Sequence, residues 1–134
     1  MVPVCNENEN VAPLAREIHA ALSGRYTFET IFVDDGSEDG TPEAVIAARD
    51  GGMPEIRLLR HAVRSGQSAA VATGVLHARA PWIATLDGDG QNDPADIPQL
   101  LAAARNSGSP TLKLVMGNRT TRRDTWLRRT SSRI

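Results

Sequence analysis

The feature that most constrains the fold is the alternation of short apolar segments with amphipathic ones along the chain. Apolar and β-branched runs predict strands, and apolar residues that recur at spacings of three and four predict helices. The predicted strands span 1–5, 27–33, 55–60, 80–86 and 112–117, and the predicted helices span 10–22, 41–50, 66–79 and 94–106. This order is typical of a mostly parallel sheet with helices on both faces. The sequence therefore predicts an α/β fold of three layers with right-handed crossovers.

The bulk composition fits one soluble globular domain. Hydrophobic residues make up 40% and charged residues 23% of 134 residues, and the net charge of −1 gives no argument for a nucleic-acid partner. Cys5 is the only cysteine, so a disulfide within the chain is excluded and a reducing compartment is allowed. No apolar run approaches the length of a membrane span.

The charge is unevenly distributed. Residues 119–134 contain six arginines and one aspartate, a net of +5, so residues 1–118 carry −6. We therefore divide the chain into a core, 1–118, and a basic tail, 119–134. The tail is either a solvated end or a surface for phosphates or anionic lipid headgroups. Trp126 and Leu127, which stand beside arginines, slightly favour the second alternative.

Two carboxylates, Asp87 and Asp89, directly follow the apolar run 82–86. A strand that ends in this way places both at the carboxyl edge of the sheet, where ligands bind in open α/β folds. Carboxylates this close repel each other unless a cation lies between them, and a divalent ion that carries a phosphorylated ligand would serve. The alternative is a solvated turn in which Gly88 and Gly90 supply backbone freedom.

A second acidic turn, with Asp34 and Asp35, follows the predicted strand 27–33. It could be an ordinary turn with a helix cap, or its carboxylates could accept hydrogen bonds from a nucleobase. Two acidic turns at one sheet edge favour a cationic or donor-rich ligand. The glycine motifs of dinucleotide oxidoreductases and P-loop NTPases are absent, as is a nucleophile elbow. His61, at a strand end, is a weaker candidate for a ligand contact.

Five segments together resemble glycosyltransferase family 2, whose members adopt the GT-A fold. The matching segments, in the order of the family, are 2–7 with Asn10 and Val11, 32–41, 64–70 with Gly74, 86–94 and 116–119. The Gly-Gln-Ser-Ala-Ala segment and the Asp-Gly-Asp-Gly-Gln-Asn-Asp-Pro segment are similar to the branch that moves sugars onto polyprenyl phosphate. The resemblance covers nearly the whole chain.

The resemblance implies an inverting transfer of a hexose from a nucleotide-diphospho-sugar, with UDP or GDP as the nucleotide, to a polyprenyl phosphate. Asp87 and Asp89 match the catalytic metal-binding pair, and Gln91 matches a third ligand of Mg²⁺ or Mn²⁺. The residues that match the donor site are Pro3, Val4, Asn6, Glu7, Asp34, Asp35, Gly66, Asp87, Gly88, Asp89 and Arg119. The resemblance also implies a cytoplasmic protein, in solution or at the cytoplasmic face of a membrane.

The resemblance leaves alternatives for the activity. We expect the acceptor side of the fold, and any membrane helices, to lie beyond Ile134. A lipid phosphate is already anionic and needs no general base, whereas a sugar hydroxyl needs a carboxylate base beyond Ile134. The chain could therefore be a donor-binding fragment without activity, or a part of a polysaccharide-extending transferase. At the position of Cys5, members of the family often have an aromatic or small polar residue instead.

Overall fold

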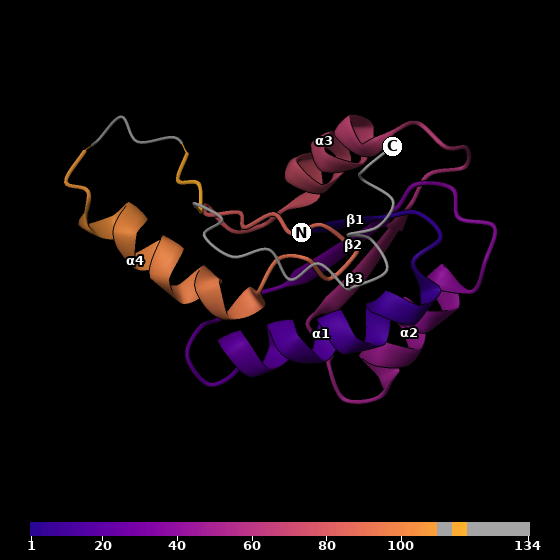
Figure 1. The fold of residues 1–134 in the computed structure, drawn as a ribbon, viewed down its shortest axis with the longest axis horizontal. Helices are drawn as coiled ribbons and strands as arrows, with labels where there is room; N and C mark the ends of the chain where they lie inside the picture. The colour runs from indigo at the N-terminus through magenta and orange to yellow at the C-terminus, as the bar shows by residue number, and fades with distance from the viewer. Residues whose placement is uncertain (110–113, 118–134) are drawn as a thin grey trace, which may run out of the picture.

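The structure is a computed structural model, and it describes residues 1–109 and 114–117. Its centre is a parallel sheet in the order β1-β2-β3, with Val2 opposite Phe32 and Thr30 opposite Ile56 (Figure 1). The strands are β1 (Val2–Val4), β2 (Thr30–Asp34) and β3 (Ile56–Arg60). β2 is buried at every position, as expected for the strand between two others.

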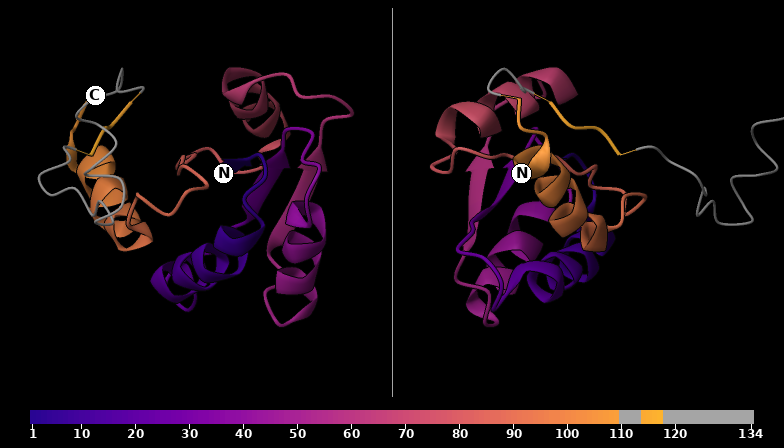
Figure 2. Two further views of the ribbon diagram at one scale, coloured as in Figure 1. Left: turned by 45° about the vertical axis from the view of Figure 1, so that its right-hand side comes forward. Right: turned by 90° about the vertical axis from the view of Figure 1, so that its left-hand side faces the viewer.

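Helices cover both faces of the sheet, which confirms the predicted α/β fold of three layers. They are α1 (Asn8–Leu22), α2 (Thr41–Asp50), α3 (Gln67–His77), the 3₁₀ turn η1 (Pro94–Asp96) and α4 (Ile97–Asn106). α1 and α2 pack side by side below the sheet in Figure 1, and α3 lies above it against β1 and β2. α4 lies to one side of the sheet and contacts α1 (Figure 2).

The alternation of side chains along β2 divides the core into two parts. Phe32 points to the face covered by α1 and α2, where Leu14 and Ile18 of α1 belong to the same buried cluster. Ile31 and Val33 point to the opposite face and pack with Ala70 of α3. The apolar period of residues 11–22 therefore corresponds to the buried stripe of α1, as the spacing predicts.

The prediction of a strand over 80–86 is wrong, because these residues form no regular secondary structure, although residues 84–86 run beside Met1 at the start of β1. The amide of Leu86 donates to the carbonyl of Met1 at 3.1 Å, and the amino group of Met1 donates to the carbonyl of Ala84 at 2.5 Å. These two bonds are the start of a parallel pairing. In the part of the chain that the structure describes, both bonds are made to Met1, and two bonds to one residue do not form a regular strand.

Two further predictions concern the last part of the chain. Residues 114–117 have no regular structure, so the predicted strand 112–117 is not found there, and residues 112 and 113 lie outside the described residues. The basic tail lies outside them as well. Among residues 1–109 and 114–117 there is no helix with the length and apolar character needed to cross a bilayer.

The connections locate the ligand edge of the sheet. From β1 to β3 the chain moves outward in one direction, with α1 and α2 on one face. α3 then returns on the other face and leads to segment 84–86 on the free side of β1. The strand order therefore reverses between β1 and this segment. Open α/β sheets bind ligands at the carboxyl ends of strands at such a switch point.

Candidate functional site

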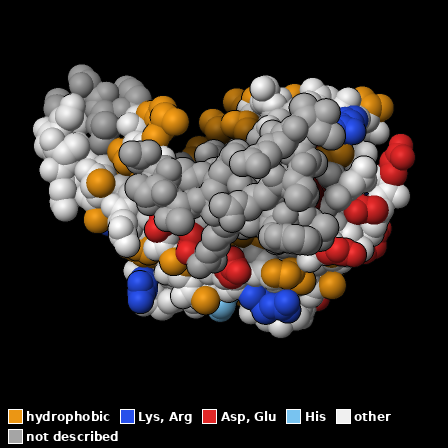
Figure 3. Space-filling view, in the orientation of Figure 1, with side chains coloured by type: hydrophobic (Ala, Val, Ile, Leu, Met, Phe, Trp, Pro, Cys, Tyr) orange, Lys and Arg blue, Asp and Glu red, His pale blue; other side chains and the backbone are white. Residues whose placement is uncertain are grey.

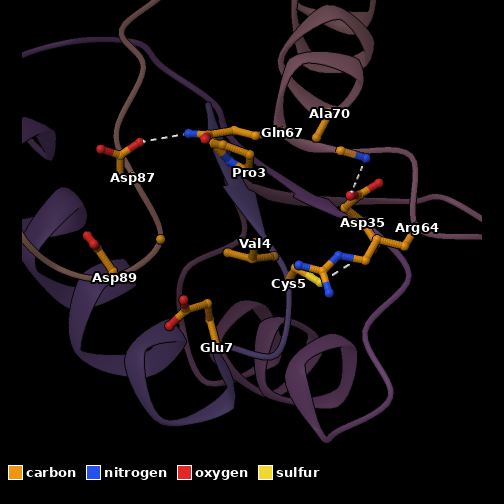
Figure 4. Close-up of a pocket in the computed structure, with 12 residues that line it drawn as sticks. Pro3, Val4, Cys5, Glu7, Asp35, Arg64, Gln67, Ala70, Asp87 and Asp89 are labelled. Carbon is orange, nitrogen blue, oxygen red and sulfur yellow. Dashed lines mark hydrogen bonds between the residues drawn. The ribbon is translucent and has the colours of Figure 1, made fainter.

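A cavity of about 360 Å³ lies at this switch point (Figure 4). Its lining comes from β1 and the loop after it, the residue after β2, the loop between β3 and α3, the first turns of α3, and the turn after segment 84–86. The lining residues are Pro3, Val4, Cys5, Glu7, Asp35, Arg64, Gly66, Gln67, Ala70, Asp87, Gly88 and Asp89. The structure thus brings the loops that the sequence analysis singled out to one edge of the sheet.

The loops after β1 and β2 are locked together by hydrogen bonds. The amide of Asn6 donates to Oγ of Ser37, and Oδ1 of Asn6 accepts from the amide of Glu38, both at 2.9 Å. The amide of Glu7 donates to Oγ1 of Thr41 at 2.9 Å. Asn6 adopts a left-handed backbone conformation with φ of 57°, which Asn tolerates better than most residues. Asn6 therefore shapes the loop and does not line the cavity.

Asp35 is a buried carboxylate at the cavity wall. Its Oδ1 accepts from the amide of Ser65 and lies 2.8 Å from Nδ1 of His61, and its Oδ2 accepts from the amide of Gly66 at 2.7 Å. Burial alone would raise the pKa of Asp35, but the hydrogen bonds from Ser65, His61 and Gly66 outweigh it and lower the pKa below its ordinary value. Asp35 is therefore ionised and joins the start of α3 to β2.

Asp34, the other acid of this turn, is fully buried and does not line the cavity. Its Oδ1 accepts from the amide of Ser37 at 3.2 Å, and its Oδ2 lies 3.1 Å from Nε of Arg60. The contact with Arg60 is an ion pair without a hydrogen bond, because no donor among the described residues is aligned with Oδ2 of Asp34. Gly36 lets the loops approach closely, since a Cβ there would lie 2.7 Å from the amide nitrogen of Arg64.

Asp87 and Asp89 lie on one loop on the side of the cavity opposite Asp35 (Figure 4). The amide of Asp87 donates to Oδ1 of Asn92 at 3.0 Å, which closes the loop, and the amide of Gln91 donates to Oδ1 of Asp89 at 3.0 Å. Between them, Gly88 packs against the end of β1, where a Cβ would lie 2.9 Å from the carbonyl oxygen of Pro3. The loop is therefore held against β1 by close backbone contact.

The carboxylate oxygens of this loop are suitable ligands for a hard divalent cation such as Mg²⁺. Neither Asp87 nor Asp89 forms an ion pair with a basic residue in the part of the chain that the structure describes. In the same residues, no three His, Cys, Asp or Glu side chains form a cluster able to hold a metal ion alone. Mg²⁺ is often held by one or two carboxylates while substrate phosphates and waters complete its shell, so two carboxylates suffice.

The charge of the cavity wall is strongly negative. Among the residues that the structure describes, four carboxylates line it, those of Glu7, Asp35, Asp87 and Asp89, against one guanidinium, that of Arg64. On the part of the face that is coloured in Figure 3, acidic side chains gather along the lower and right margins of the grey region, and basic ones form separate small groups. A wall of this charge favours a cation or a ligand rich in hydrogen-bond donors, and it repels an anion that arrives without a cation.

The predicted donor-site residues fall into two groups. Pro3, Val4, Glu7, Asp35, Gly66, Asp87, Gly88 and Asp89 line the cavity. Asn6 lines a neighbouring cavity of about 740 Å³ together with His61, Asp34 is buried, and Arg119 lies outside the described residues. Gln91, the predicted third metal ligand, is not in the wall of the first cavity.

Four residues of the cavity wall were not predicted as site residues from the sequence, and they are Cys5, Arg64, Gln67 and Ala70. The motif 64–70 contained three of them and was the available signal. Gln67 has a specific contact, since its Nε2 donates to Oδ1 of Asp87 at 3.1 Å. Sγ of Cys5 lies 3.5 Å from the carbonyl oxygen of Asp35, so this thiol contacts the same strand end.

The fold and the cavity together define an α/β domain with a cavity at its strand-order switch point. The model of the family described as "Glycosyl transferase family 2" matches residues 1–133. The chain therefore belongs to glycosyltransferase family 2, which confirms the resemblance stated above.

Individual relatives agree with this assignment. The chain is 38% identical over 128 residues to the dodecaprenyl-phosphate galacturonate synthase of Rhizobium johnstonii, a match that covers 92% of the chain and 36% of that protein. It is 36% identical over 139 aligned residues to the undecaprenyl-phosphate 4-deoxy-4-formamido-L-arabinose transferase of Aeromonas hydrophila, covering 100% of the chain and 40% of that protein. These relatives are polyprenyl-phosphate sugar transferases, and the chain spans two fifths or less of their length.

A solved structure also matches the fold. The mannosyltransferase PcManGT from Pyrobaculum calidifontis, in complex with GDP-Man and Mn²⁺, is similar with a TM-score of 0.68 and 28% sequence identity. The match covers 83% of this chain and 32% of that chain. The GT-A-like architecture is therefore shared with an enzyme of the same family.

Proposed function

We propose that this chain is the donor-binding part of an inverting, metal-dependent transferase that moves a hexose from a nucleotide-diphospho-sugar to a polyprenyl phosphate. The observation that carries the proposal is the position of Asp87 and Asp89. Both line the switch-point cavity, opposite Asp35, without a basic partner among the described residues. The core is residues 1–118, and the basic tail begins the acceptor side.

The charge of the cavity supports metal dependence. A nucleoside diphosphate is anionic, and the described part of the cavity wall has four carboxylates against one guanidinium. Mg²⁺ or Mn²⁺ held by Asp87 and Asp89, with Gln91 as a third ligand, would reverse the local charge and accept diphosphate oxygens. A bound dication supplies Lewis-acid stabilisation of the negative charge that develops on the departing diphosphate. Mn²⁺ in the similar mannosyltransferase agrees with this choice of metal.

The remaining residues of the cavity wall provide the contacts with the nucleotide-sugar. Pro3 and Val4 at the end of β1, and Glu7 in the loop that follows, are held by bonds from this loop to residues 37–41, so they offer a preformed edge to a UDP or GDP nucleotide. Asp35 is ionised and accepts hydrogen bonds from the base or the ribose. Asn6 and Asp34 act on the site through the loops that they hold. Arg64 and Arg119 offer charge-assisted hydrogen bonds to the phosphates.

The acceptor follows from the relatives and from the chemistry. The two relatives carry dodecaprenyl phosphate and undecaprenyl phosphate in their names. Direct attack of a lipid phosphate oxygen on the anomeric carbon breaks the bond to the diphosphate and inverts that carbon. The attacking oxygen is already anionic, so no general base is required. With a lipid acceptor, the domain would work at a membrane face, and we propose the cytoplasmic one. The basic tail would contact that membrane surface.

A transfer assay with the full chain tests the proposal. Radiolabelled UDP- and GDP-sugars are incubated with Mn²⁺ and undecaprenyl phosphate in detergent micelles, and in parallel with a soluble oligosaccharide acceptor. The proposal predicts a lipid-linked sugar that is lost on addition of EDTA. Label in the oligosaccharide alone would indicate a polysaccharide-extending enzyme. Metal-dependent donor binding without transfer to either acceptor would show that these residues bind the donor but do not by themselves complete the acceptor side.

A further inference from the structure

The hydrogen bonds that Asp35 receives from the protein limit what it can accept from a ligand. An ionised carboxylate has about four acceptor positions, two on each oxygen. Nδ1 of His61 and the amide of Ser65, both at 2.8 Å, fill the two positions on Oδ1. The amide of Gly66, at 2.7 Å, fills one position on Oδ2. Among the described residues, this leaves a single open acceptor position on Oδ2.

His61 is fixed in its role by a second contact. Its Nε2 lies 2.8 Å from Oγ1 of Thr73 on α3, and its side chain is 16% exposed. Because ionised Asp35 has no proton to donate, Nδ1 of His61 must carry the proton of the bond between them. The Thr73 hydroxyl can donate or accept, so it holds the ring whether His61 is neutral or charged. The ring therefore cannot turn away from Asp35 without losing both bonds.

From this geometry we propose that His61 is a specificity-determining positioning residue, which restricts Asp35 to one hydrogen bond with the donor and so favours a base with a single ring N–H, as in UDP. The inference rests on the proposed function, because it assumes that the cavity binds a nucleotide. Asp35 lines that cavity, whereas His61 lines the neighbouring one and contacts the same carboxylate.

The chemistry of the bases explains the selection. Uracil presents one ring N–H between two carbonyl groups, so one acceptor satisfies it. Guanine presents a ring N–H and an amino N–H side by side, a pair that matches both oxygens of a free carboxylate. With Oδ1 of Asp35 filled, one of these two guanine donors has no acceptor on this carboxylate. An unsatisfied donor in a desolvated site costs affinity.

Calorimetry of the full chain with UDP and with GDP, in Mn²⁺, tests the inference. We expect the wild type to bind UDP more tightly than GDP. His61→Leu removes the bond to Oδ1, so the ratio of GDP to UDP dissociation constants should fall by about threefold to tenfold, the worth of one hydrogen bond. His61→Asn keeps a donor near the position of Nδ1 and should preserve the wild-type ratio. His77→Leu, an exposed α3 position away from the cavities, is the matched control.

The outcomes separate this inference from the proposed function. A wild type that binds GDP as tightly as UDP, or a ratio unchanged in His61→Leu while both affinities fall together, would overturn the role of His61 and leave the proposed function standing. A wild type that binds neither nucleotide in Mn²⁺ would overturn both. Should His61→Leu fail to fold, Thr73→Val releases the ring from α3 and should shift the ratio in the same direction. An unchanged ratio in that variant would also overturn the inference.

Discussion

Gln67 and Asp87 meet across the switch-point cavity. The side-chain amide of Gln67, at the start of α3, donates to Oδ1 of Asp87 at 3.1 Å, although the two residues are 20 positions apart in the chain. The bond spans the space above Pro3 (Figure 4). It joins the helix on one face of the sheet to the loop on which the proposed metal ligands lie.

This bond predicts that Gln67→Leu weakens metal binding without unfolding the chain. Loss of the amide frees Asp87 to rotate, and removal of an outer-shell partner typically costs about tenfold in metal affinity. Mn²⁺ titration followed by electron paramagnetic resonance, with UDP present, measures the effect. Gln99→Leu is the matched control, because Gln99 is an exposed residue of α4. Equal Mn²⁺ affinity in wild type and Gln67→Leu would refute the positioning role of Gln67.

Close packing at Gly88 makes a second prediction. A Cβ at Gly88 would lie 2.8 Å from Cγ1 of Val4 and 2.9 Å from the backbone carbonyl of Pro3, so Gly88→Ala must push the loop away from β1. We expect a loss of about 1–3 kcal/mol in the free energy of unfolding, together with weaker Mn²⁺ binding. Gly117→Ala is the control, because a Cβ there would meet only Leu100 at 3.9 Å. Denaturant unfolding compares the variants, and a Gly88→Ala protein as stable as Gly117→Ala would contradict the packing argument.

The left-handed conformation of Asn6 gives a third prediction. Asn6→Ala loses the bond to Glu38 and keeps a positive φ that disfavours a side chain with Cβ, so we expect a loss of about 2 kcal/mol in the free energy of unfolding. Asn6→Gly loses the same bond but adopts this φ freely, and we expect a smaller loss of about 1 kcal/mol. Thermal unfolding measures both variants. Equal losses would show that the backbone conformation carries no cost.

The sequence could predict the fold because each element carries its own signal. The apolar period of 10–22, the proline at the start of 41–50 and the β-branched run before Asp34 are local signals, and the structure has elements at all three. The strand over 80–86 was wrong because its formation depends on partner backbone beside it, which local pattern does not reveal. The carboxyl ends of parallel strands share one edge, so Asp35 and Asp87 could be placed together from topology alone.

Side-chain partners at the site could not be predicted in the same way. The contact of Gln67 with Asp87, and that of His61 with Asp35 and Thr73, depend on how α3 lies on the sheet. No spacing in the sequence encodes that position. His61 was a weak candidate for a ligand contact, and the structure places it in the wall of the neighbouring cavity, in contact with Asp35.

The lowered pKa of Asp35 predicts a loss of stability in acid. Because the pKa is lower in the folded chain than its ordinary value near 3.9, ionised Asp35 contributes stability that is present above about pH 4. This contribution is lost as the pH falls through the folded pKa. Asp35→Asn should be less stable at pH 7 and should lose less stability than wild type between pH 5 and the acid limit. Asp50→Asn, at an exposed α2 position, should follow the wild-type curve.

The proposed metal bridge at Asp87 and Asp89 is the central claim, and calorimetry of UDP-sugar and GDP-sugar binding tests it most directly. Each ligand is titrated into wild type, Asp89→Asn and the control Asp96→Asn, an exposed position at the start of α4, in Mn²⁺ and in EDTA. We predict that at least one donor binds wild type and Asp96→Asn in Mn²⁺. We also predict that EDTA, or Asp89→Asn in Mn²⁺, weakens this binding by at least about tenfold. Equal donor affinity in Mn²⁺ and EDTA, or in wild type and Asp89→Asn, would contradict the account.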